Sequence, residues 1–235
     1  RDRRPRGVVV MCRVRSTLRF LHSRPVGRVV AVRGHADCTL SRTVPPSGRR
    51  PLTVTGAGIA TLARDIYSCV PTHMTKAGDG TLRLTGTNTL GLVRLNAGTL
   101  LVGNNFALGG GTLVISGGTT IGADGAARVL SNSVTINGDF SIGGSNDLTL
   151  SGTIGFGDSS TVTVTGTVIA SLGDLVYAGF GQPISITKSG TGTLRLSEAN
   201  ALDIVVTAGL LQVAHNLALG GNLTIDGGAG DMGAF

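Results

Sequence analysis

Three aspartates could cooperate in acid–base catalysis: Asp139, Asp147 and Asp158, with Arg128 nearby in the sequence. Glycoside cleavage, for example, needs two carboxylates held at a defined separation. Each of the three aspartates, however, is next to Gly, Asn or Ser, which are typical turn residues. We therefore expect turn or solvated roles for these carboxylates, and we predict no catalytic residue.

A serine nucleophile is the second candidate chemistry. The segment Gly157-Asp158-Ser159-Ser160 resembles the nucleophile segment of chymotrypsin-like proteases, but Ser160 stands where a glycine is expected. No histidine lies between His73 and His215, so a catalytic triad has no obvious base. We expect no serine protease site.

Metal binding has weak support in the sequence. His215 takes the place of Asn104 in an internal repeat, and a single histidine does not make a metal site. Residues 143–148 and 227–231 partly resemble calcium-binding nonapeptide repeats, but neither completes the pattern and they are not in tandem. We predict no metal site and no cofactor.

The composition restricts the elements that could position any such group. The 235 residues include 38 Gly, no Trp and only eight Phe and Tyr, while 41% of the residues are hydrophobic. The chain can therefore bury a substantial core, built from Val, Ile, Leu and Ala. No apolar run is long enough for a membrane-spanning helix, so we expect no such segment.

The charge divides the chain near Val70-Pro71. Residues 1–74 hold 14 Arg against three acids, a charge of +11, whereas residues 75–235 carry −4. An Arg-rich arm could neutralise phosphates, but this one lacks interleaved aromatic residues and a recognisable reading helix. We expect no nucleic-acid partner, and we predict that residues 1–51 are disordered or not part of the natural product. Residues 52–74 are predicted as an irregular first rung or a cap.

The strongest signal is an internal repeat. Residues 75–84 return as residues 187–196 with eight of ten positions identical, and residues 98–110 return as residues 209–221. Between the copies lie short alternating segments that predict strands, and the first four of them run into Gly. These segments are residues 112–116, 133–137, 147–151, 161–165 and 183–187.

A parallel β-helix explains this pattern better than a β-sandwich. Inward residues of each rung stack on similar residues of the next, so aliphatic side chains fill a narrow interior with little room for Trp or Tyr. The predicted turn glycines are Gly78, Gly80, Gly190 and Gly192. The predicted inward residues are Leu82, Leu84, Leu100, Val102, Leu194, Leu196, Leu211 and Val213. We therefore predict an all-β single-stranded solenoid over residues 75–235.

Residues 75–89 and 96–110 carry a pattern that resembles the passenger-associated transport repeat of bacterial autotransporters. The pattern is Thr-Lys-x-Gly-x-Gly-Thr-Leu-x-Leu-x-Gly-x-Asn-Thr, followed by Asn-Ala-Gly-Thr-Leu-x-Val-Gly-Asn-Asn-x-Ala-Leu-Gly-Gly. The second copy departs from it at Glu198 and Leu210. The resemblance covers about residues 75–228, and its motif is specific in combination.

This resemblance implies a right-handed β-helical stalk on the surface of a Gram-negative bacterium, exported through an outer-membrane translocator barrel. It implies a non-enzymatic role in which stepwise folding supports translocation, with adhesion to a host surface or aggregation with neighbouring cells. We recognise neither a signal peptide nor a C-terminal barrel, and expect a passenger fragment. The absence of Cys after Cys69 fits threading through a narrow pore. The alternative is a β-helical carbohydrate-active enzyme, a polysaccharide lyase or glycoside hydrolase.

Overall fold

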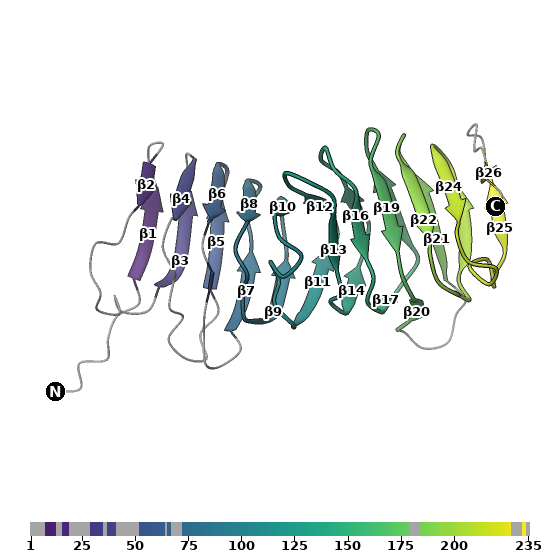
Figure 1. Ribbon diagram of the computed structural model, residues 1–235, viewed down its shortest axis with the longest axis horizontal. Coiled ribbons are helices and arrows are strands. Elements are labelled where there is room, and N and C mark those ends of the chain that lie inside the picture. The colour runs from purple at the N-terminus through teal and green to yellow at the C-terminus, as the bar shows by residue number, and fades with distance from the viewer. Residues whose placement is uncertain are drawn as a thin grey trace.

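The protein is a parallel β-solenoid whose strands stack along one long axis (Figure 1). The computed structural model describes residues 8–12, 16–18, 29–34, 37–40, 52–63, 65–66, 72–178, 184–226 and 232–233. These residues contain strands and turns but no helix, so none of their segments is a helix able to cross a bilayer. The predicted all-β parallel solenoid is confirmed.

Three parallel sheets form the walls of the solenoid. Sheet A has nine strands: β1 (Val8–Cys12), β3 (Val29–Gly34), β5 (Leu52–Gly56), β7 (Thr72–Lys76), β9 (Leu90–Leu95), β11 (Thr112–Ser116), β14 (Val134–Asn137), β17 (Ile154–Phe156) and β20 (Leu175–Tyr177). Sheet B has eleven: β2 (Ser16–Leu18), β4 (Cys38–Leu40), β6 (Ile59–Leu62), β8 (Thr81–Leu84), β10 (Thr99–Val102), β12 (Thr119–Ala123), β15 (Phe140–Ile142), β18 (Ser160–Val164), β21 (Ser185–Ser189), β23 (Asp203–Val206) and β25 (Leu223–Ile225). Sheet C has six: β13 (Arg128–Leu130), β16 (Leu148–Leu150), β19 (Ile169–Leu172), β22 (Thr193–Leu196), β24 (Leu210–Val213) and β26 (Met232–Gly233).

The core consists of aliphatic columns that run along the axis. In-register pairing places each inward residue of a strand beside an inward residue of the next rung. One column of sheet B is Ala60, Leu82, Leu100, Ile121, Ile142 and Val164, all buried. Burial of each large aliphatic side chain contributes about 1.5–3 kcal/mol, so this stacking is the main source of stability.

The predicted inward residues lie in these columns. Seven of the eight are buried, and the eighth, Val213, is partly buried and packs against the core. The predicted strands are also confirmed, because the five alternating segments correspond within two residues to β11, β14, β16, β18 and β21. The strands between them were not predicted; β15 and β17, for example, have only three residues each.

The two copies of the repeat occupy different pairs of sheets. In the first copy, Lys76 ends β7 in sheet A and the motif continues into β8 in sheet B. In the second copy, Lys188 belongs to β21 in sheet B and the motif continues into β22 in sheet C. Sheet C begins at β13, and sheet A ends at β20. The motif therefore builds a corner between consecutive strands, whichever two sheets meet there.

Strand pairing also continues across the compositional boundary near Val70-Pro71. Leu52 of β5 pairs with Met74, and Ile59 of β6 pairs with Thr81. Residues 52–62 thus form a rung in register with the repeat region. Within residues 1–51 the structure describes β1 to β4, which continue sheets A and B. These strands were not predicted, because strands of three to six residues carry too little periodicity. The rest of this segment lies outside the described residues, and its predicted disorder stays a prediction.

The alternation on β8 gives a direct test of the solenoid. Leu82 is fully buried, whereas Thr81, one residue earlier, is partly exposed on the outer face. We expect Leu82→Asp to destabilise the protein by about 3 kcal/mol or more, because it buries an unpaired carboxylate. Thr81→Asp should change stability by only about 0.5 kcal/mol. A denaturant titration of both variants measures the difference, and equal losses would show that β8 is buried on both faces.

Candidate functional site

The candidate carboxylates serve as links between rungs. Asp139 lies just before β15, and its Oδ1 accepts a hydrogen bond from the backbone N–H of Thr161 at 2.7 Å. Asp147 lies just before β16 and accepts one from the N–H of Ile169 at 2.8 Å. In each case the donor is 22 residues further along the chain, one rung away. Both carboxylates therefore satisfy a backbone donor where a strand begins, the turn role that their neighbours predict.

The three aspartates do not converge on one corner. Asp139 and Asp158 belong to turns that lead into sheet B, whereas Asp147 belongs to a turn that leads into sheet C. Asp158 is exposed, and its backbone carbonyl accepts a hydrogen bond from the Ser160 hydroxyl at 3.1 Å. Asp147 is therefore separated from the other two, while Asp139 and Asp158 precede neighbouring strands of sheet B.

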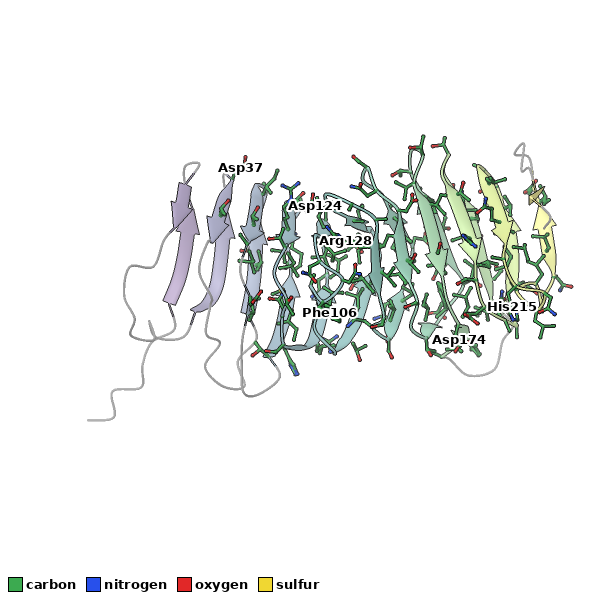
Figure 2. All side chains as sticks on the ribbon, viewed as in Figure 1. Asp37, Phe106, Asp124, Arg128, Asp174 and His215 are labelled. Carbon is green, nitrogen blue, oxygen red and sulfur yellow. The ribbon has the colours of Figure 1, made fainter. Side chains whose placement is uncertain are left out.

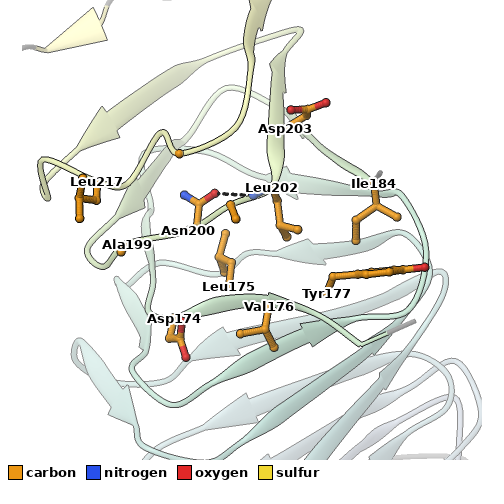
Figure 3. Close-up of a pocket in the computed structure, with 12 residues that line it drawn as sticks. Asp174, Leu175, Val176, Tyr177, Ile184, Ala199, Asn200, Leu202, Asp203 and Leu217 are labelled. Atoms are coloured by element: carbon orange, nitrogen blue, oxygen red, sulfur yellow. Dashed lines mark hydrogen bonds between the residues drawn. The ribbon is translucent and has the colours of Figure 1, made fainter. Parts of the chain in front are cut away.

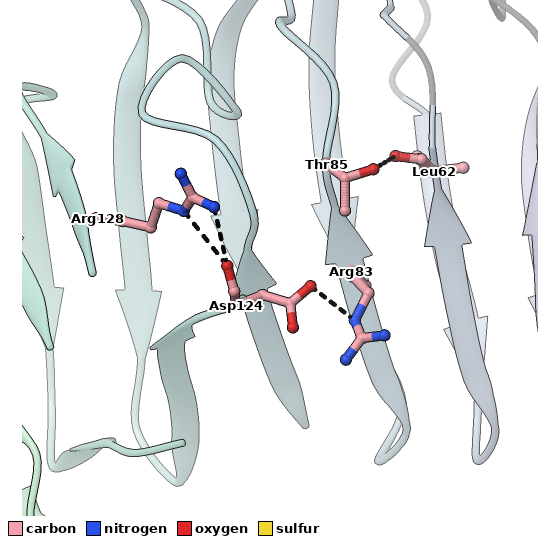
Figure 4. A network of polar contacts seen from close by, with 5 residues as sticks. All are labelled: Leu62, Arg83, Thr85, Asp124 and Arg128. Carbon is pink, nitrogen blue, oxygen red and sulfur yellow. Dashed lines mark hydrogen bonds and ion pairs between the residues drawn. The ribbon is translucent and has the colours of Figure 1, made fainter. Parts of the chain in front are cut away.

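Arg128 points toward a fourth carboxylate residue instead (Figure 4). Its Nε and Nη2 donate to the backbone carbonyl of Asp124 at 3.3 and 3.1 Å. The Asp124 carboxylate forms an ion pair with Arg83, with 3.0 Å between Oδ2 and Nε. Asp37, Asp124 and Asp174 lie at different points along the long axis (Figure 2). The charged groups are thus dispersed over the surface.

The serine segment also has a structural role. The Ser159 hydroxyl accepts a hydrogen bond from the N–H of Ser185 at 3.1 Å, and Ser160 is buried. His73 lies on the exposed face of β7 in sheet A, away from this turn into sheet B. The structure does not bring a histidine of the described residues to either serine.

His215 replaces Asn104 in an equivalent turn. The Asn104 Oδ1 accepts a hydrogen bond from the N–H of Phe106 at 2.8 Å, and the His215 Nδ1 accepts one from the N–H of Leu217 at 3.1 Å. Both hydrogen bonds are local contacts within a turn. Among the described residues there is no group of three or more His, Cys, Asp or Glu that could hold a metal. One of the two calcium-like segments, residues 227–231, lies outside the described residues.

The most unusual polar site was not found by the sequence analysis. Lys76 and Lys188 are the chain's two lysines, they occupy equivalent repeat positions, and both are fully buried. The Lys76 ammonium donates to the carbonyls of Gly78 at 2.5 Å and Ala97 at 3.0 Å. Their recurrence beside turn glycines was the available signal, because a repeated lysine in a solenoid must either face solvent or satisfy a corner.

The second copy reproduces this corner. The Lys188 ammonium donates to the carbonyls of Ser189, Gly190 and Ala208 at 2.8–2.9 Å. Ala208 belongs to the next rung, so the ammonium joins two successive turns. Burial lowers the pKa of Lys188 to about 8. Burial also lowers the pKa of Lys76, where the nearby carboxylate of Asp79 opposes the effect.

Glycine leaves room for each ammonium. A Cβ at Gly209 would lie 2.3 Å from the Gly190 carbonyl oxygen and 2.7 Å from the Lys188 Nζ, and Gly209 has φ +73°. Gly98 stands in the same relation to Lys76, with φ +70°. The predicted turn glycines are required for two different reasons, backbone conformation and close packing. Gly78 and Gly190 have positive φ, whereas a Cβ at Gly80 would come within 2.3 Å of a carbonyl oxygen of the neighbouring rung.

Buried asparagines satisfy a second corner. The Asn88 Oδ1 accepts a hydrogen bond from the N–H of Ile66 at 2.7 Å, and its Nδ2 donates to the Ala107 carbonyl at 2.6 Å. Asn200, the equivalent residue of the second copy, donates to the Ala218 carbonyl and accepts from the N–H of Leu202 at 3.0 Å. Lysine and asparagine of the repeat therefore both complete backbone hydrogen bonding inside the solenoid.

A groove of about 890 Å³ opens where sheet A ends at β20. Leu175 and Tyr177 on one side face Leu202 and Ile184 on the other (Figure 3). Asn200 is the buried polar residue of its lining, and both ends of its amide already bond within the protein. Two carboxylates also line the groove, and both accept hydrogen bonds within the protein: Asp174 from the Thr153 hydroxyl at 3.3 Å and Asp203 from the N–H of Asn222 at 2.7 Å.

The buried ammoniums predict an unusual pH dependence. Because the pKa of Lys188 is about 8 in the folded state and near 10.5 when unfolded, the unfolded chain binds more protons between these values. Stability should therefore rise with pH through this window, by an amount on the order of 1–3 kcal/mol for this residue. We expect Lys188→Met to show a smaller rise than the wild type in urea titrations at pH 7.5 and 10. An identical rise in both proteins would contradict a depressed pKa for Lys188.

The corner glycines predict a graded effect of a single methyl group. Gly209→Ala should destabilise by more than Gly166→Ala, which has a similar φ of +67° but no atom within 4 Å of its Cβ position. Gly166→Ala isolates backbone strain, about 1–2 kcal/mol. The additional loss at Gly209 measures the crowding against Lys188. Thermal or denaturant unfolding of the two variants gives the comparison, and equal losses would mean that the corner relaxes freely.

No family model matches the chain, and comparisons with curated proteins and with solved structures found no match either. Any statement on function therefore depends on the residues and their geometry. The clearest geometric result is that the polar residues of the repeat bond to backbone groups of their own and neighbouring rungs.

Proposed function

We propose that the chain is a non-enzymatic stalk, part of an autotransporter passenger exposed on the surface of a Gram-negative bacterium. One observation carries this proposal: the repeated polar residues, Lys76 and Lys188 with Asn88 and Asn200, are consumed in stacking one rung on the next. A motif selected for an active site would present such groups to a ligand. Here these groups bond to the backbone instead, and the result is a rung with an aliphatic core that can be repeated along the axis.

The arrangement of contacts supports stepwise folding during export. In each sheet, a strand pairs with the strands one rung before and after it. Stability in such a protein is a sum of rung and nearest-neighbour terms, so a rung can form on the preceding one as it emerges. Each newly formed rung would oppose return of the chain through a translocator barrel. The barrel and a host or neighbouring cell surface are the proposed partners.

The carbohydrate-active enzyme remains the competing hypothesis for a β-helix, and three facts weigh against it. Asp139 and Asp147 each accept a backbone hydrogen bond, and Asp158 lies at a different corner from Asp147. The groove beside β20 is lined by one aromatic side chain, Tyr177, and by two carboxylates, Asp174 and Asp203, which both accept hydrogen bonds within the protein. We favour the stalk because each of these groups has a structural explanation.

A surface-display experiment tests the stalk proposal. The chain is joined to a signal peptide and to a translocator barrel, and its surface level is measured by protease accessibility on intact cells. We expect wild type and Thr81→Asp to reach the surface at similar levels, and Leu82→Asp to be displayed several-fold less, because it prevents the rung from stacking. Equal display of all three chains would contradict a role for folding in export. Display of none would contradict the passenger assignment.

A further inference from the structure

The outer face of sheet B carries a straight column of hydroxyl groups. Successive register pairs align the six residues of this hydroxyl column, one from each of six neighbouring strands between β8 and β21. They are Thr81, Thr99, Thr120, Ser141, Thr163 and Ser189. All six are partly exposed. With about 4.8 Å between neighbouring strands, the column is about 24 Å long. No register shift interrupts sheet B among these pairs.

These hydroxyls have no partner within the described protein, unlike the hydroxyls at the corners. The corner residues Thr85, Ser197 and Thr207 donate to carbonyl groups of the preceding rung. No hydrogen bond from the hydroxyl column is found within the described residues, and its groups are therefore open to solvent. A regular row of fixed hydroxyls binds water molecules at the same fixed spacing.

The column itself carries no charge and no aromatic side chain, and the exposed carboxylates of Asp79 and Asp139 lie at its edge, two residues before Thr81 and Ser141. The column is flanked by Arg83, Leu101 and Gly122 on one side, and Arg83 is paired with Asp124. On the other side Thr161 and Thr187 extend it to a second hydroxyl row. The equivalent outward columns differ. Sheet A presents Thr75, Arg94, Val114, Thr135, Gly155 and Val176, and sheet C presents Val129, Thr149, Ser171, Arg195 and Gln212.

Charge, area and periodicity together select the occupant of this face. An ionic partner finds no charge along the column itself, and the charges at its edges are of both signs. A strip about 24 Å long and about 10 Å wide covers on the order of 250 Å², far below the roughly 800 Å² per partner of a stable protein interface. Binding of a crystalline glycan would use aromatic stacking, which the column cannot supply. Ordered water is the remaining candidate ligand. Rows of oxygen atoms in ice repeat at nearly the spacing of β-strands.

We propose that the outer face of sheet B binds the surface of ice. The column hydroxyls join the lattice as hydrogen-bond donors and acceptors, and the threonine methyl groups occupy the spaces between oxygen rows. The ligand is the solvent in its crystalline form, so weak contacts repeated at each rung act together without a limiting ligand concentration. The site goes beyond the stalk role and does not depend on it.

The test uses the full chain in an ice-recrystallisation assay and a thermal-hysteresis measurement. Wild type should inhibit growth of ice crystals. Thr120→Lys should abolish this activity because a long charged side chain rises from the centre of the column. The matched controls are Thr135→Lys on sheet A and Thr149→Lys on sheet C, which are equally outward-facing, partly exposed threonines and should retain the activity. Circular dichroism and the unfolding midpoint establish that each variant is folded.

If Thr120→Lys does not fold, Ser141→Lys tests the same column. A wild type without effect on ice overturns the proposal, as does equal loss of activity in the sheet A and sheet C controls. Co-sedimentation of the chain with insoluble cellulose or chitin, lost in Thr120→Lys and without any effect on ice, would overturn it in favour of a glycan. None of these results changes the surface-display outcome, so the two proposals fail separately.

Discussion

The need to satisfy backbone groups where the chain turns governs this structure. In a parallel solenoid the backbone groups of each strand pair with those of the neighbouring rungs. At the corners, where the chain bends, carbonyl and N–H groups lack such strand partners. The protein meets this constraint with a small set of side chains. Lysine ammoniums join the carbonyls of successive turns, asparagine amides bridge neighbouring rungs, and aspartates receive the N–H that begins the next strand. Removal of the lysine or asparagine groups leaves buried backbone atoms unpaired, whereas the hydrogen bonds of the aspartates are exposed.

This constraint also occupies groups with catalytic potential. Asp139 and Asp147 each accept a hydrogen bond from a backbone N–H one rung away, so each carboxylate is held at its own corner. The buried lysines are similarly enclosed by carbonyl oxygens. The outer face of sheet B is the exception, because its hydroxyls project between corners and no backbone group requires them.

The change of sheets along the axis follows from the local nature of the corner. Lys188, Gly190 and the apolar pair on β22 rebuild the arrangement of Lys76, Gly78 and β8. Nothing in that arrangement depends on which wall precedes it. Three-stranded rungs between the copies shift the second copy by one wall, so sheet A ends and sheet C continues. The groove beside β20 lies at this transition.

The sequence by itself determined the solenoid, the inward columns and the turn role of the aspartates, because each depends on periods of two residues or on local turn chemistry. Leu82, Leu100 and Val102 were identifiable from alternation alone. The position of Lys76 could not be read this way, since a lysine beside a strand end is as compatible with solvent as with an interior corner. Only the tertiary structure places the Ala97 carbonyl one rung away, where it accepts a hydrogen bond from the Lys76 ammonium. The same holds for the hydroxyl column, whose members are separated by 18 to 26 residues in sequence and become a row only through the register of sheet B.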